Sequence, residues 1–194
     1  MKLLKKLLFS AAAAVLLSAC GTGGGGDAAP SGETGKEDQL SVSVEGMEKT
    51  EGLIVAIEDG RVLVNDVSYS MDENTHLVSL GDGSEKTLAA EDLEKGMRVD
   101  VYHSGVVALS LPGQAYADVF AVQKGEEEMK QAEAFRSFLE EEDDQPWVIK
   151  KVEFPEGGIR FDYTSDSNEE FRVELDTDTK TYTKEPIDDE HSGE

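Results

Sequence analysis

The stretch that decides the fold is Leu53-Ile54-Val55-Ala56-Ile57-Glu58-Asp59-Gly60-Arg61-Val62-Leu63-Val64. Its two apolar ends are rich in β-branched residues, which fit the pleated surface of a strand. Between them, the dipeptide Asp59-Gly60 tolerates the positive φ angles of a two-residue hairpin turn. This pattern predicts an antiparallel β-hairpin, so we expect the surrounding chain to be a β protein.

Further strand-like segments follow the hairpin at short intervals. Residues 75–80 end at a glycine-rich turn, residues 97–102 alternate apolar with polar side chains, and residues 106–111 and 116–122 follow. Residues 88–95 favour one or two helical turns that Gly96 ends. Together these segments predict a small, mainly β domain over residues 48–123.

Four short motifs in this region occur in a recognisable order. They are Gly52-x-Ile54-x-x-Ile57, Gly60-x-Val62-x-Val64, Asp92-Leu93-x-x-Gly96-x-x-Val99-x-Val101 and Ser110-x-Pro112-x-Gln114-Ala115-x-Ala117. This order resembles the YobA-like domain of unknown function found in Gram-positive lipoproteins, although that family usually has an aromatic residue where this chain has Leu111. The resemblance implies a five-stranded OB-like barrel on an exported anchor, with no known catalytic residues to carry over.

The chain after Lys124-Gly125 changes to a helical period and then returns to strands. An apolar stripe at spacings of three and four comprises Met129, Ala132, Phe135, Phe138 and Leu139. We expect this helix to stop near Glu141 and the acidic run 140–144 to be solvated. Strands at 147–154, 159–163 and 171–175 then form an antiparallel meander of three strands, or of four if residues 180–183 add a further strand. Residues 124–184 therefore predict a small α+β unit, which resembles the PepSY-type domain in the order of its elements. Residues 185–194 are expected to be a disordered tail.

The N-terminus has the order of a secretory signal. Three lysines precede an apolar stretch from Leu7 to Leu17, which is too short for a transmembrane helix. Leu17-Ser18-Ala19-Cys20 resembles the lipobox of bacterial lipoproteins at all four positions. This resemblance implies removal of residues 1–19, a diacylglyceryl thioether on Cys20, and an acyl chain such as palmitate on the new amino terminus. Residues 20–47 then form a flexible tether, and the protein is held on the extracytoplasmic face of the cell membrane.

Composition excludes several kinds of chemistry. Cys20 is the only cysteine, so a lipidated chain has no thiol for a disulfide, a zinc site or catalysis. The formal net charge is −24, and removal of residues 1–19 takes away three lysines and no acidic residue, which leaves −27. Nucleic acid is excluded as a partner because binding to phosphates needs lysine and arginine clusters. We therefore expect a soluble, acidic folded part.

Catalytic motifs are missing from the sequence. His76, His103 and His191 have no zinc-site spacing, and the end of a strand beside a turn predicts that His103 lies on the surface. No serine stands in a Gly-x-Ser-x-Gly elbow or a Ser-x-x-Lys motif. Ser110 is interpreted as a hydroxyl that caps backbone at a corner. The sequence thus predicts no enzyme and no cofactor.

Two acidic clusters are weak candidates for Ca²⁺. Their members are Asp162, Asp166, Asn168 and Glu170 in the first, and Asp176 and Asp178 in the second. An EF-hand loop needs glycine at position 6 and a glutamate at position 12, but a loop that starts at Asp166 has Phe171 and Thr177 there. Ordinary turn residues are the main interpretation of both clusters, and weak extracellular Ca²⁺ binding is the alternative.

A functional expectation follows from the anchor, the tether and the missing catalytic groups. We expect a membrane-anchored, extracytoplasmic, non-catalytic module that binds a protein or an envelope component. The alternative is a module that binds cations or carbohydrate. Aromatic residues such as Trp147, Tyr102, Tyr116 and Tyr163 are candidates for a ligand groove, although a small domain needs aromatic side chains first for its core.

Overall fold

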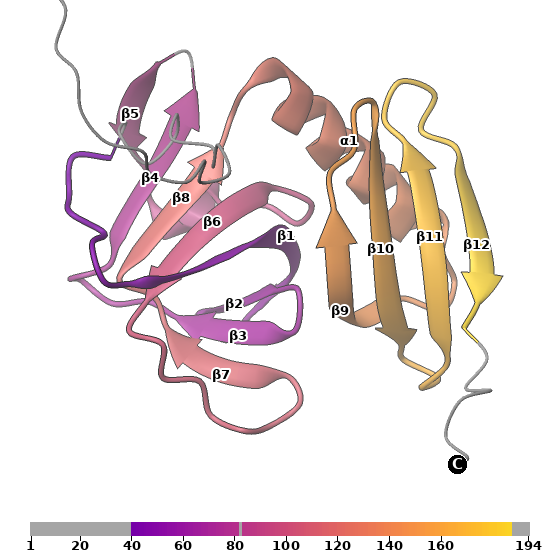
Figure 1. Cartoon of the computed structure of the whole chain (residues 1–194), viewed down its shortest axis with the longest axis horizontal. Helices are drawn as coiled ribbons and strands as arrows, with labels where there is room; N and C mark the ends of the chain where they lie inside the picture. Colours follow the sequence, from indigo (N-terminus) through magenta and orange to yellow (C-terminus); the bar gives the residue numbers. More distant parts are fainter. Residues whose placement is uncertain (1–39, 82, 188–194) are drawn as a thin grey trace, which may run out of the picture. The chain divides into compact units, whose positions relative to one another are not determined.

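Strands make up most of the regular structure in the computed structural model, which describes residues 40–81 and 83–187. A mixed sheet of eight strands has the order β5-β4-β8-β6-β1-β2-β3-β7 (Figure 1). Its strands are β1 (Glu48–Glu58), β2 (Arg61–Val64), β3 (Val67–Ser70), β4 (His76–Gly81), β5 (Ser84–Thr87), β6 (Arg98–His103), β7 (Gly113–Tyr116) and β8 (Val119–Gln123). The expectation of a mainly β protein is therefore confirmed.

A helix and a second sheet form the C-terminal part. The sheet is antiparallel, with the order β12-β11-β10-β9, and α1 crosses one of its faces (Figure 1). The elements are α1 (Glu126–Glu141), β9 (Pro146–Glu153), β10 (Gly158–Ser165), β11 (Glu170–Asp176) and β12 (Tyr182–Pro186). The predicted helix followed by a meander of three or four strands is confirmed, with four strands present, and so is the end of the helix at Glu141.

The hairpin of β1 and β2 has the predicted turn. Glu58 pairs with Arg61, so only Asp59 and Gly60 lie between the strands. Their φ angles are 51° and 73°, the left-handed values that a two-residue turn of this kind requires. The local sequence therefore decides both the turn and the register.

Strand β1 is shared by two hydrophobic cores. Residues 48–53 pair with β6, and residues 54–58 pair with β2 across a register shift. Because side chains alternate along a strand, Ile54 points into the first core, whose residues come mainly from the eight-stranded sheet. Leu53 and Val55 point into the second core, which also contains residues of α1 and the four-stranded sheet. A hydrogen bond also joins the two sheets, because the backbone carbonyl of Asn65 accepts from the Ile149 N–H of β9 at 3.1 Å.

The segment from Val106 to Gln123 differs from the sequence prediction. Residues 106–111 were expected as a strand, but they form an irregular loop with a single bridge between Ala108 and Gln114. Gly105 has a φ of 82°, and Pro112 has no N–H to donate to a neighbouring strand. Strand pairing is therefore interrupted on both sides of the segment before β7 begins at Gly113. The predicted strand 116–122 is instead two strands, because the chain changes partner between Tyr116 and Val119. Strand β7 runs parallel to β3, and β8 pairs with β6 and β4.

Two four-residue strands, β3 and β5, are additional to the predicted ones. Each forms a hairpin with the strand before it, β2 or β4. The helical turns expected over residues 88–95 shrink to a 3₁₀ turn over Ala90–Asp92, followed as expected by Gly96, whose φ is 85°. The resemblance implied a five-stranded barrel over residues 48–123, and the sheet formed by these residues has eight strands.

Helix α1 buries most of the predicted stripe. Ala132, Phe135 and Phe138 are buried, but Met129 is 56% exposed, and Ala134 is buried as well. The helix begins after Gly125 without a side-chain cap and carries three glutamates in its first turn, where the macrodipole favours acidic residues.

Three expectations about polar segments need correction. The acidic run 140–144 is only partly solvated, because Glu142 is buried and pairs with Lys184 at 2.8 Å. The described end of the tether, residues 40–47, is in contact with the sheet: Leu40 packs beside Val78 and Leu80 of β4. Strand β12 runs to Pro186, two residues into the segment expected as a tail, while residues 188–194 lie outside the described residues.

The Tyr163 hydroxyl in the second core leads to a testable expectation. It is buried and has no hydrogen-bond partner among the described residues, and burial raises the pKa of Tyr163. An unsatisfied buried polar group costs about 1–3 kcal/mol. We therefore expect Tyr163→Phe to stabilise the protein by about 1 kcal/mol, measured by urea unfolding.

Tyr69 provides the matched control in the first core. Its buried hydroxyl donates a hydrogen bond to Thr50 Oγ1 at 2.8 Å. Tyr69→Phe is expected to destabilise by about 1 kcal/mol, the net contribution of one hydrogen bond. Equal losses of stability in both variants would contradict the assignment of Tyr163 as unsatisfied.

Candidate functional site

The described residues contain only part of the predicted functional set. Cys20, the expected lipidation site, lies outside them, and so does His191. Within residues 40–81 and 83–187, no helix has the length and apolar character needed to cross a membrane. Across the same residues, no three His, Asp or Glu side chains group in a way that could hold a metal ion.

The weak Ca²⁺ candidates are separated and largely have other partners. Asp162 makes a bidentate ion pair with Arg172 at 2.8 and 2.9 Å, and Glu170 pairs with Lys150. Asn168 adopts a left-handed φ of 65° in the turn between β10 and β11. Asp166, at the start of the same turn, lines a cavity described below. The first cluster is therefore spread over a hairpin and its turn.

The second acidic cluster forms a turn. Asp176 Oδ1 accepts hydrogen bonds from the backbone N–H groups of Thr179 and Asp178 and from the Thr179 hydroxyl. These bonds, that of the Thr179 N–H first, lower the pKa of Asp176. Asp178 lies 3.4 Å from Lys130 of α1. Both acids therefore have structural roles, which agrees with the interpretation as turn residues.

Ser41, His76 and Glu85 lie together, and these are the residue types of a hydrolase triad. In a triad, one ring nitrogen of the histidine faces the serine and the other faces the acid. Here the Ser41 hydroxyl and the Glu85 carboxylate both contact Nε2 of His76, at 3.3 and 3.0 Å. The Ser41 hydroxyl also donates directly to Glu85 at 2.8 Å. These contacts attach Ser41 to the β4–β5 hairpin. They do not activate its hydroxyl, because His76 does not stand between Ser41 and Glu85 as the base of a triad does.

His103 is buried, so the expectation of a surface position was wrong. Its Nδ1 accepts a hydrogen bond from the Gly105 N–H at 3.1 Å, and its Nε2 lies 3.3 Å from Thr50 Oγ1. The ring also packs against Tyr69. His103 therefore fixes the beginning of the loop that follows β6.

That loop, residues 104–112, is here named the apolar loop. Residues 104–117 contain no charged side chain, although 31% of the whole chain is charged. Leu109 is fully exposed, Val106 is largely exposed, and Leu111 is 57% exposed. Exposed apolar residues that cluster on one loop are typical of a binding surface, whereas single ones are ordinary. The sequence pattern predicted a strand for part of this segment, but its lack of charge was a visible signal.

The backbone of the apolar loop is held by hydrogen bonds at several points. The Ala108 N–H donates to the Gln114 carbonyl at 2.8 Å, and the Ser110 hydroxyl donates to the Pro112 carbonyl at 2.8 Å. Val107 turns inward and packs on the first core. The sequence interpretation that the Ser110 hydroxyl bonds to backbone at a corner is confirmed. The outward leucines are thus presented by an ordered support, which lowers the entropy cost of binding.

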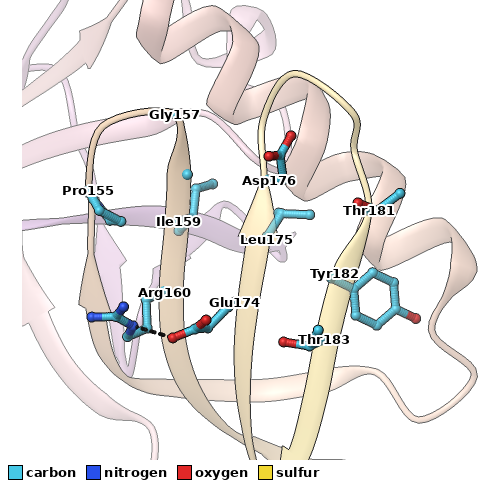
Figure 2. A pocket seen from close by; sticks show the side chains of 11 residues that line it. Pro155, Gly157, Ile159, Arg160, Glu174, Leu175, Asp176, Thr181, Tyr182 and Thr183 are labelled. Atoms are coloured by element: carbon cyan, nitrogen blue, oxygen red, sulfur yellow. Dashed lines mark hydrogen bonds and ion pairs between the residues drawn. The ribbon is translucent and has the colours of Figure 1, made fainter.

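A shallow groove of about 350 Å³ lies on the second sheet, near the start of β10 and the end of β11 (Figure 2). Arg160 and Glu174 point toward one another along its floor, and the Arg160 Nε donates to Glu174 Oε1 at 2.9 Å. Arg160 also contacts Glu153. Arg160 and Glu174 are paired with each other and Asp176 is bonded within its own turn, so this groove offers little to a ligand.

A cavity of about 430 Å³, here named the Trp147 cavity, lies between the β1–β2 hairpin and the start of β9. The first sheet contributes Glu58, Asp59, Arg61 and Ser68, and the beginning of β9 contributes Trp147. Trp147 is the only tryptophan in the chain and is 38% exposed. The sequence identified Trp147 as a groove candidate, but it did not show which residues it would face.

Comparisons with family models, curated proteins and solved structures give no match. Functional inference therefore rests on the residues and geometry described above.

Proposed function

We propose that this chain is a lipoprotein held on the extracytoplasmic face of the cell membrane by lipid on Cys20. We also propose that it is a non-catalytic module that docks a partner protein through the apolar loop. The lipobox Leu17-Ser18-Ala19-Cys20 behind a short apolar segment supports the anchor. The exposed leucines of the apolar loop are the single observation that carries the docking role.

An OB-like arrangement is the proposed fold of the first sheet. Strands β7 and β8 are two halves of one segment, residues 113–123, separated only by Ala117 and Asp118. The first half runs parallel to β3, and the second runs antiparallel to β6, so one bent segment joins opposite ends of the order β6-β1-β2-β3. The β4–β5 hairpin is then an addition to a five-stranded barrel. The motifs that resemble the YobA-like domain lie within this part.

The apolar loop accounts for affinity through burial. Covering a leucine side chain is worth about 1.5–3 kcal/mol, so Leu109 and Leu111 together contribute about 3–6 kcal/mol toward the cost of association, which is about 4–15 kcal/mol. The rest of the interface has to supply the remainder. Glu48 lies against Gly105 at the start of the loop, and the whole chain carries −24. The partner that fits is a protein with an apolar cleft and a basic rim.

Charge also decides between this partner and other occupants. A second copy of the chain brings the same net charge of −24, which opposes association. Membrane surfaces that contain anionic lipid repel an acidic body in the same way. A basic partner protein is the occupant that gains from both the apolar residues and the negative net charge of the chain.

A pair of aspartate substitutions tests the docking role. Leu111→Asp is expected to lower the yield of a crosslinked complex on intact cells at least tenfold, because a buried charge without a partner is strongly unfavourable. Met129→Asp is the matched control, since Met129 is 56% exposed on α1 and Leu111 is 57% exposed. Crosslinking and gel analysis of both variants at equal expression measures the difference. Equal yields from the two variants would contradict docking through the loop.

A further inference from the structure

We propose that the Trp147 cavity binds an uncharged saccharide. This cavity shares Pro112 with the end of the apolar loop but contains neither of its exposed leucines, and the proposal does not depend on the docking role. The cavity volume of about 430 Å³ lies within the range of small-molecule pockets. Most of the lining comes from the β1–β2 hairpin, β3 and the start of β9, and the connecting segments add Lys95, Pro112, Gln145 and Asp166.

Flat apolar surfaces form one part of the lining. Trp147 is joined there by Pro112 and Pro146. An aromatic ring left 38% exposed on a strand offers a broad face to a ligand, and its indole N–H is an additional donor. The apolar C–H face of a sugar ring is a suitable partner for such a flat surface.

Polar groups on the lining are held in position by the protein. The Arg61 Nε donates to Ser68 Oγ at 2.9 Å and its Nη2 donates to the Ser68 carbonyl at 2.6 Å. Arginine has five N–H groups, so three remain to donate to a ligand. The Gln145 Nε2 donates to the carbonyls of Leu139 and Glu142, which leaves its Oε1 as an acceptor. Donors and acceptors fixed before binding reduce the entropy cost of binding hydroxyl groups.

The balance of charge disfavours an anionic ligand, and the polar lining disfavours an apolar one. Arg61 and Lys95 face three acidic side chains of the lining, Glu58, Asp59 and Asp166. An anionic ligand meets an excess of carboxylates here and the field of a chain with net charge −24. An apolar ligand leaves these polar groups without partners, at a cost of roughly 1–3 kcal/mol for each. A neutral molecule rich in hydroxyl groups satisfies both conditions.

Fluorescence of the single tryptophan reports on this cavity directly. The full lipidated protein, in a polyoxyethylene detergent that contains no sugar, is titrated with four uncharged trisaccharides: chitotriose, cellotriose, maltotriose and mannotriose. We expect a saturable change in Trp147 emission with at least one of them at a Kd of about 1 mM or below. Trigalacturonate, which is anionic, is expected to bind at least tenfold more weakly.

Substitutions locate the binding. Saturation-transfer NMR with the trisaccharide that binds best is expected to show at least a tenfold loss of affinity in Trp147→Ala. Tyr116→Ala is the matched control, because Tyr116 is also 38% exposed but lies outside the cavity. Arg61→Gln provides a second variant that keeps the aromatic face, and circular dichroism checks that each variant folds. The proposal is overturned if no uncharged trisaccharide gives a saturable signal, if trigalacturonate binds equally well, or if folded Trp147→Ala and Arg61→Gln both bind like the unmodified protein.

Discussion

Phe138→Ala is expected to lower the free energy of unfolding by about 3–5 kcal/mol, the usual cost of truncating a fully buried phenylalanine. Phe138 is on α1, and its ring packs edge-to-face on Phe161, Tyr163 and Tyr182 of the second sheet, with centroids 4.9–6.0 Å apart. It also stacks on Phe135. Loss of this ring leaves a cavity at the centre of the core that joins helix and sheet.

Met129→Ala on the same helix is the control for Phe138→Ala. Met129 is largely exposed, so its truncation is expected to change stability by about 0.5 kcal/mol or less. Urea unfolding followed by circular dichroism measures both variants. A loss below about 1.5 kcal/mol in Phe138→Ala would show that α1 does not pack on the second sheet through this residue.

Gly52→Ala is expected to cost about 2–4 kcal/mol, although it adds a single methyl group. A Cβ at Gly52 would overlap the side-chain amide of Asn65. That amide accepts a hydrogen bond from the Leu53 N–H at 3.1 Å and donates one to the Glu51 carbonyl at 2.9 Å. These two bonds hold the point at which β1 changes partner from β6 to β2. Displacement of Asn65 leaves both backbone groups without partners, at about 1–3 kcal/mol each.

Gly60→Ala separates this effect from the general cost of replacing a glycine. Gly60 has a φ of 73°, and a methyl group added there would meet nothing within 4 Å, so only backbone strain of about 1–2 kcal/mol is expected. Urea unfolding of Gly52→Ala, Gly60→Ala and Asn65→Ala measures the three costs. In the double variant of Gly52 and Asn65, the costs are expected to be less than additive. A Gly52→Ala variant no less stable than Gly60→Ala would contradict the role of Asn65.

Local signals were sufficient for much of the fold. The β1–β2 hairpin follows from Asp59-Gly60 between β-branched runs, and α1 follows from apolar residues at helical spacing. Both depend on interactions within a few residues, which a sequence displays directly. The antiparallel meander after α1 was predictable for the same reason, since each of its strands pairs with the next one in the chain.

Features that depend on distant partners were not predictable in this way. The break between β7 and β8 exists because Tyr116 pairs beside β3 while Val119 pairs beside β6. Burial of Glu142 depends on Lys184, which lies 42 residues further along the chain. His103 is buried because Thr50 and Tyr69 of other strands surround it. Each outcome is decided by tertiary packing that overrides the local pattern.

The candidate site was only partly visible in the sequence. The uncharged run 104–117 and the single Trp147 both stand out in a chain of this composition. Their arrangement does not, because the lining of the Trp147 cavity combines residues from the β1–β2 hairpin with others nearly one hundred positions later, such as Gln145 and Asp166. The acidic residues of 162–170 and 176–178 are close in sequence, but they do not form a cluster of free carboxylates in the structure.

We propose attachment through lipid on Cys20, which would place the folded part outside the cell. Cys20 is the only cysteine, so Cys20→Ser removes every thiol while the rest of the chain is unchanged. The most direct measurement is metabolic labelling with an alkyne analogue of palmitate, followed by separation of membrane and soluble fractions. We expect the unmodified protein to carry the label in the membrane fraction, and Cys20→Ser to be unlabelled and released from the membrane, because acyl chains provide the attachment. An unlabelled protein in the soluble fraction, or an equal label on Cys20→Ser, would contradict the anchor.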